Sequence, residues 1–174
     1  MAKQLERLNV DVIEAGFAIV SPGDFTSVKT IASEIKNASV ASLARAKRLD
    51  IEYAWNAVKC AADPILHVFL ATSDIHMKYK LNLTREEVKA QIRDSVSFAR
   101  SLCSTVEFSA EDATRSDLRF LAEVFQIAID SGASVINVPD TVGYAVPEEM
   151  EKIITYLKEH LNLGDTIISV HCHN

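Results

Sequence analysis

The feature that most constrains the fold is a regular alternation of short β-rich runs with longer amphipathic stretches. Most of the β-rich runs begin about thirty residues after the previous one. This interval is the usual size of a βα unit, in which a strand is followed by a helix that crosses back over the sheet. The sequence therefore predicts parallel strands covered by helices. The expected strands are residues 10–17, 39–44, 65–71, 105–109, 134–138 and 166–171.

The stretches between these runs carry helix start and stop signals. Ser21-Pro22 offers an N-cap followed by proline in the first turn, and Thr84 with Glu87 matches a capping box. Gly132 follows the apolar stripe of another helix and is expected to end it. We also expect helical residues at 2–8, a weaker helix at 50–61, and an inserted loop at 72–83.

Two architectures fit a repeated βα pattern: a doubly wound open sheet and a (β/α)₈ barrel. No GxGxxG or GxxxxGK[ST] phosphate loop follows any of the expected strands, which weakens a nucleotide-binding open sheet. Polar residues follow nearly every strand, and barrels draw their sites from many strand ends in this way. An open sheet concentrates its site at one switch point instead. The favoured fold class is α/β, a partial TIM (β/α)₈ barrel.

The chain has room for one sizeable core. Its 174 residues provide six expected strands, whereas a complete barrel has eight strands in about 250 residues. We therefore expect a single partial barrel domain over residues 1–174, corresponding to strands two to seven. Strands one and eight are not expected within it.

Composition excludes several classes of function. The formal charge of −6 disfavours binding to nucleic acid or to anionic membranes. No apolar run reaches the roughly 18 residues that span a bilayer, and the first residues lack the apolar region of a signal peptide. Cys60, Cys103 and Cys172 have no paired spacing, so we interpret them as reduced thiols in a cytoplasmic protein.

His171-Cys172-His173 is the sharpest local motif. In a strand, residues i and i+2 point to the same face, so both imidazoles can converge on one divalent cation. Imidazole suits Zn or Mn, and Mg is acceptable if carboxylates and water complete the shell. The alternative is a solvated histidine pair, because HxH alone is a weak motif.

Several other residues near strand ends are candidates for chemistry. Glu14 ends an apolar strand, where a carboxylate must be paired, metal-bound or hydrated, and a salt bridge to an arginine is one reading. Glu111 is two residues after Ser109, so both can face inward, and a carboxylate there can act as a base or substrate anchor. A lone histidine such as His67, within an apolar strand, is more often a satisfied core residue than a catalyst.

Several segments together resemble the 2-isopropylmalate synthase family. The most specific are ATSDIHMKYKL, EFSAEDATR and PDTVGY, and the resemblance runs from about Leu8 to the end of the chain. IEAGF and the HxH motif alone would indicate the wider group of homocitrate synthase, citramalate synthase and hydroxymethylglutaryl-CoA lyase. The other matching segments are SPGDF, INVPDTVGYAVPEE and ISVHCHN.

The resemblance implies a metal-dependent Claisen-type condensation of acetyl-CoA with 2-oxoisovalerate, the first step of leucine biosynthesis. It implies that His171 and His173 are ligands of a divalent metal such as Mg, Mn or Zn. It also implies small-molecule substrates, no nucleic-acid or membrane partner, and a homodimer. The residues implied at the site are Glu111 and Glu14 as catalytic carboxylates, and His67, Ser109 and Thr141 as binding residues.

The sequence departs from the family pattern in what it lacks. The family's Arg-Asp-Gly-Glu-Gln segment on strand one, which carries a metal ligand, is absent, as are its C-terminal subdomain and regulatory domain. We therefore expect this segment to be inactive alone. Two alternatives stay open: a citramalate or homocitrate synthase, and a non-catalytic barrel segment that self-associates through unpaired strand edges.

Overall fold

A computed structural model describes residues 1–173 and confirms the six strands. They form one fully parallel sheet in which each strand pairs with its neighbours in the sequence, in the order β1-β2-β3-β4-β5-β6. Each strand lies within two residues of its expected bounds. The strands are β1 (Val12–Gly16), β2 (Ser39–Arg45), β3 (Pro64–Ala71), β4 (Val106–Glu111), β5 (Val135–Asp140) and β6 (Ile167–Cys172).

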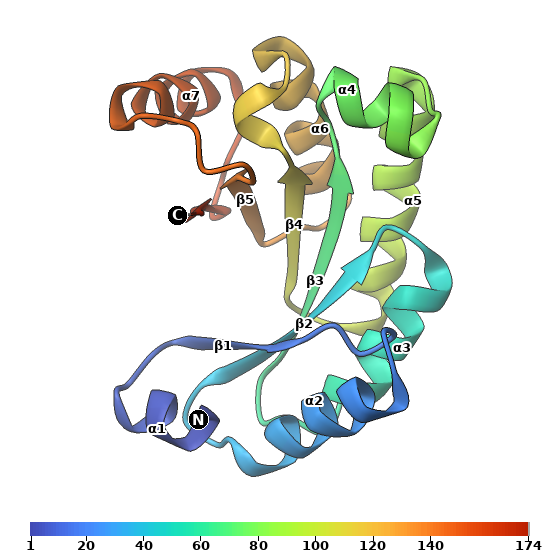
Figure 1. The fold of residues 1–174 in the computed structure, drawn as a ribbon, viewed down its shortest axis with the longest axis vertical. Helices are drawn as coiled ribbons and strands as arrows, with labels where there is room; N and C mark the ends of the chain where they lie inside the picture. Colours follow the sequence, from blue (N-terminus) through green and yellow to red (C-terminus); the bar gives the residue numbers. More distant parts are fainter. Residues whose placement is uncertain (174) are drawn as a thin grey trace.

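The strand order decides between the two architectures. A doubly wound sheet reverses its order at a switch point, whereas a barrel adds each strand beside the last. Here the order follows the sequence without reversal, and Figure 1 shows the sheet curling so that β1 and the C-terminal strand lie on the same open side. The chain is therefore a curled, partial (β/α) barrel, as the polar strand ends indicated.

Helices cover the convex face of the sheet (Figure 1). The N-cap at Ser21 and the capping box at Thr84 both form as expected, because each hydroxyl accepts a hydrogen bond from a backbone N–H of the first turn. The helices are α1 (Ala2–Arg7), α2 (Pro22–Glu34), α3 (Arg48–Val58), α4 (Asp74–His76), α5 (Arg85–Leu102), α6 (Leu118–Asp130) and α7 (Pro147–His160), with a π-helical turn η1 (Met77–Leu81) and a 3₁₀ turn η2 (Ala113–Arg115).

One expectation about local structure was wrong, and one helix has shifted bounds. Residues 72–83 were expected to be a loop, but α4 and η1 make most of this segment helical, until Asn82 ends it in the left-handed conformation. These turns are too short to show a helical stripe in the sequence, and buried Met77 anchors them. The helix expected at 50–61 is present as α3, but it begins at Arg48 and ends at Val58, where the chain forms a turn.

Side chains alternate between the two faces of the sheet. Residues such as Leu66, Phe108 and Ile136 are fully buried against the helices. Their neighbours along each strand point to the opposite, concave side, which we call the inner face. The apolar core therefore lies between the sheet and the helices. Many inner-face residues are polar, so the inner face is where functional side chains are expected.

No helix within residues 1–173 is long and apolar enough to cross a membrane.

Candidate active site

The inner face holds a chain of hydrogen bonds that joins four strands. Nδ1 of His67 on β3 contacts the Glu14 carboxylate from β1, and Nε2 lies 2.6 Å from Oγ of Ser109 on β4. Nδ2 of Asn137 on β5 donates to the same Ser109 oxygen at 2.7 Å. Glu107 on β4 also lies near this chain, 3.7 Å from His67 Nε2. These five residues are called the inner-face cluster.

The cluster is built by strand register. His67 pairs with Glu107 across β3 and β4, and Ser109 pairs with Asn137 across β4 and β5. Paired residues of neighbouring strands point to the same face, so their side chains meet. His67, Ser109 and Asn137 are each at most 5% exposed, whereas the Glu14 side chain is 43% exposed at the open edge of the sheet.

Burial and charge act against each other within the cluster. Burial alone would raise the pKa of Glu14, but its hydrogen bond to His67 and the charges of His67 and His171 hold that pKa below its ordinary value. Burial opposes the charged form of His67, yet Glu14 and Glu107 raise its pKa. Burial also raises the pKa of Glu107, helped by Glu14 and opposed by His67 and His171. The cluster therefore favours an imidazolium between two carboxyl groups.

His171 and His173 lie on the inner face of β6, at the open side. Their rings stack with centroids 4.5 Å apart and an angle of 5° between ring planes. Both imidazoles thus present themselves side by side, which fits two ligands of one divalent cation. Within residues 1–173, no group of three His, Cys, Asp or Glu side chains is arranged to hold a metal. The structure supplies two candidate ligands there and no third.

Glu111 and Thr141, the two remaining predicted site residues, lie at the rim and not in the cluster. Glu111 ends β4 and pairs with Lys80 of η1, whose Nζ is 2.6 Å from its carboxylate. Thr141 follows β5, and its hydroxyl accepts a hydrogen bond from the backbone N–H of Asp112 at 3.0 Å. That bond holds Asp112 in the left-handed conformation.

Asp112 belongs to a separate, buried network at the rim. Its carboxylate is fully buried and accepts hydrogen bonds from Arg115 at 2.8 and 2.9 Å and from Ser73 at 2.5 Å. These bonds tie the end of β3 to the turn after β4. Asp112 therefore fixes the loops around the site.

The sequence interpretation missed two members of the cluster, Glu107 and Asn137. Both carry a usable signal: Glu107 is two residues before Ser109, and Asn137 lies inside an apolar strand, so alternation places each with its inward neighbours. The reading of Glu14 as an arginine salt bridge was wrong, because its partner is His67. Likewise His67 is not an isolated core histidine, since it joins two charged groups.

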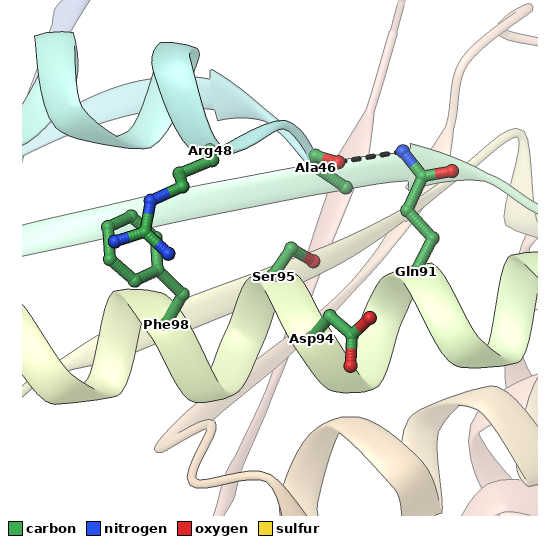
Figure 2. A pocket seen from close by; sticks show the side chains of 6 residues that line it. All are labelled: Ala46, Arg48, Gln91, Asp94, Ser95 and Phe98. Carbon is green, nitrogen blue, oxygen red and sulfur yellow. Dashed lines mark hydrogen bonds between the residues drawn. The ribbon is translucent and has the colours of Figure 1, made fainter.

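The cavity in Figure 2 is distinct from this site. It has a volume of about 370 Å³ and lies between the start of α3 and the side of α5, on the convex side. The Arg48 guanidinium stacks 4.0 Å from the centre of the Phe98 ring, and Gln91 donates to the carbonyl oxygen of Ala46 at 2.7 Å. These contacts occupy Arg48 and Gln91, two of the polar residues along its wall.

A fully parallel sheet that curls, with its strands in sequence order and helices on its convex face, defines a partial (β/α) barrel. The sequence model of the HMGL-like family matches residues 1–174, and the chain belongs to this family. Among solved structures, hydroxymethylglutaryl-CoA lyase from Pseudomonas aeruginosa matches with a TM-score of 0.76 at 19% identity, covering 97% of this chain and 58% of that one. The lyase from Bacillus subtilis matches with a TM-score of 0.69, also at 19% identity, covering 98% of this chain and 59% of that one. These likenesses confirm the barrel fold.

Closer relatives are found among curated sequences. The chain is 54% identical to 2-isopropylmalate synthase from Dictyoglomus turgidum, 57% to that from Pyrococcus furiosus and 58% to that from Bacillus cytotoxicus. Each match covers 100% of this chain and 35% of the relative. The chain thus spans about a third of the length of the curated relatives it matches.

Proposed function

We propose that this chain is part of the catalytic barrel of a 2-isopropylmalate synthase. That enzyme would condense acetyl-CoA with 2-oxoisovalerate in the first step of leucine biosynthesis. The observation that carries the proposal is identity of 54–58% to curated 2-isopropylmalate synthases along the whole chain. The three cysteines are free thiols, which fits a reducing compartment such as the cytoplasm.

The reaction has two chemical stages. The acetyl methyl group loses a proton and its carbon adds to the ketone carbon of 2-oxoisovalerate, whose oxygen takes up a proton. Water then cleaves the thioester and releases CoA. In the first stage a base must face the acetyl group, and in both stages negative charge develops on oxygen.

We assign different parts of the reaction to residues at the rim and to residues on the inner face. We assign Glu111, held at the rim by Lys80, to the acetyl end of the site. The inner-face cluster would line the pocket of the 2-oxo acid, with Ser109 positioned by His67 and Asn137. Glu14 acts through His67, because its carboxylate fixes the orientation of that imidazole. Thr141 shapes the same rim through Asp112.

We assign a divalent metal to His171 and His173. The side-by-side imidazoles fit it, and such a metal would polarise the ketone of the bound 2-oxo acid as a Lewis acid. Because residues 1–173 provide no third ligand at this place, we propose that the isolated segment binds metal weakly and is inactive alone. The longer enzyme would therefore supply the rest of the site.

The test is thiol release by the full-length protein that contains this segment. We expect CoA to appear from acetyl-CoA only when 2-oxoisovalerate and a divalent metal are both present, and chelation to abolish it. Replacing His171 by alanine should lower kcat/KM by about 100-fold or more, since a metal Lewis acid contributes several kcal/mol. Full activity after exhaustive chelation, or in the His171→Ala variant, would contradict the metal assignment.

A further inference from the structure

The rim beside Glu111 contains a buried aspartate that no step of the proposed reaction uses. Asp112 follows Glu111 directly in the chain and is fully buried. Its carboxylate accepts hydrogen bonds from Nε and Nη2 of Arg115 at 2.8 and 2.9 Å, and from Oγ of Ser73 at 2.5 Å. Nδ1 of His76 lies 3.3 Å from the same oxygen that Ser73 contacts. The two-pronged arginine pair and the hydroxyl therefore hold this carboxylate in one orientation.

The first route from Asp112 to Glu111 is the backbone. Asp112 has φ 66° and ψ 36°, the left-handed conformation, which residues other than glycine seldom adopt. The Thr141 hydroxyl accepts from the N–H of Asp112 at 3.0 Å, while Arg115 holds the side chain. These bonds maintain an unusual turn immediately after Glu111. The direction in which the Glu111 side chain leaves the end of β4 therefore depends on Asp112.

The second route passes through α4 and η1. Ser73 is the N-cap of α4 and His76 is its last residue, so the Asp112 carboxylate lies against both ends of this short helix. The η1 turn continues directly from α4 and carries Lys80, whose Nζ is 2.6 Å from the Glu111 carboxylate. Asp112 thus fixes the segment that brings a cation to Glu111, and the two routes meet at one carboxylate.

We propose that Asp112 is a positioning residue that sets the place of the Glu111 carboxylate, both through its own backbone and through Lys80. The inference rests on the proposed function, which assigns Glu111 to the acetyl end of the site, and it adds how that carboxylate is held. Displacement of a reacting group by about 1 Å can cost about 100-fold in rate. Asp112 acts indirectly, because its own side chain is fully buried.

The test is steady-state kinetics of the full-length protein, followed by thiol release from acetyl-CoA with 2-oxoisovalerate as the second substrate. Asp112→Asn keeps the size of the side chain and tolerates the left-handed conformation, but it loses the charge and replaces one acceptor oxygen by a donor. We expect kcat to fall by about tenfold or more, while KM for 2-oxoisovalerate stays within about twofold. KM is spared because the 2-oxo acid is assigned to the inner face.

Asp50→Asn is the matched control. Asp50 is also a buried carboxylate, 3% exposed, and Arg45 donates to it at 2.5 and 3.2 Å. It follows a different strand, β2, and no hydrogen bond or ion pair within residues 1–173 joins it to Glu111 or Lys80. We expect Asp50→Asn to lower the melting temperature and to leave kcat unchanged. An equal fall of kcat in both variants overturns the inference, because loss of any buried ion pair would then explain it.

A second pair of variants tests the route to Glu111. Lys80→Met removes the cation from the Glu111 carboxylate and should lower kcat by itself. Because Asp112 and Lys80 act on one carboxylate, Asp112→Asn should lower kcat by a smaller factor in the Lys80→Met protein than in the wild type. Equal factors in the two backgrounds would mean that Asp112 acts independently of Glu111, and they overturn the inference.

Thermal melting shows whether each variant is folded at the assay temperature. Ser73→Ala removes one donor to Asp112 and replaces Asp112→Asn if that variant does not fold, with a fall of kcat again expected. An unchanged kcat in the folded variant overturns the inference. Failure of the wild type to consume 2-oxoisovalerate overturns the proposed function instead, and that result is read from the wild type alone. Glu151→Gln, at an exposed position on α7, is the surface control and should change neither kcat nor KM.

Discussion

At the scale of single residues, the contact between Glu14 and His67 joins a partly exposed carboxylate to a buried imidazole on the inner face. His67 has 6% of its side chain exposed and lies between Glu14 and Glu107. A buried imidazole is costly to charge unless carboxylates compensate it, and here two do so. Removal of one carboxylate therefore affects both the stability of the fold and the orientation of the imidazole.

The pH dependence of stability follows from this pair. The pKa of Glu14 is held below its ordinary value of 4.5, so its contribution is present above pH 4.5 and is lost as the pH falls through the folded value. The pKa of His67 is raised above 6.5, so its contribution is present below pH 6.5 and is lost as the pH rises through the folded value. Both contributions coexist between these two values.

We therefore expect Glu14→Gln to lower the melting temperature most between pH 4.5 and 6.5, and progressively less as the pH rises toward 9. Melting curves followed by circular dichroism across this range measure the difference from the wild type. Glu151→Gln serves as the control and should show no such pH dependence. A loss that grows steadily above pH 7 would mean that the pair does not stabilise the fold through its charges.

Sequence reasoning identified Glu14, His67 and Ser109 as single candidates but did not join them. The bonds between them link strands separated by up to 53 positions, and only the register of the sheet brings these side chains together. Glu107 was missed for a related reason, since its flanking apolar residues resemble any half-buried strand. Glu107 can be recognised as a site candidate only once its side chain is known to point to the inner face.

At the scale of elements, start signals with a local mechanism were predictable and element ends were less so. The capping box of α5 depends on residues three apart, and it formed as expected with Glu87 bonded back to Thr84. The end of α3 and the turns of α4 and η1 depend on how the chain packs over the sheet. Those contacts are set by the tertiary fold, so no local sequence pattern predicted them.

Thr84→Ala tests the contribution of the capping box. The substitution removes the hydroxyl that accepts from the Glu87 backbone N–H, and we expect it to lower the free energy of unfolding by about 1 kcal/mol. Thr155→Ala, an exposed position inside α7, is the matched control and should be neutral or slightly stabilising. Urea denaturation of both variants measures the difference, and equal effects would show that the cap contributes nothing specific.

At the scale of the whole molecule, the curled sheet has two unpaired edges. Within residues 1–173, β1 pairs with β2 alone and β6 pairs with β5 alone. Apolar side chains near these edges are exposed: Val12 at 45%, Ile167 at 62% and Val170 at 51%. Open edges beside exposed apolar groups favour pairing with another chain.

We expect the 174-residue segment, expressed alone, to self-associate. Light scattering should report species larger than a monomer, and replacing Ile167 and Val170 by lysine should shift the population toward monomer. Lysine in place of exposed Leu49, which lies on α3 and not on an edge strand, should not have this effect. A monodisperse monomer for the unmodified segment would show that these edges do not drive self-association.

Competition between substrates tests the proposal that the full-length protein makes 2-isopropylmalate. The full-length protein is given acetyl-CoA, a divalent metal, and equal concentrations of 2-oxoisovalerate, pyruvate and 2-oxoglutarate, and the products are separated by mass spectrometry. We expect 2-isopropylmalate to exceed each other product by about tenfold or more. A mixture dominated by citramalate or homocitrate would contradict it.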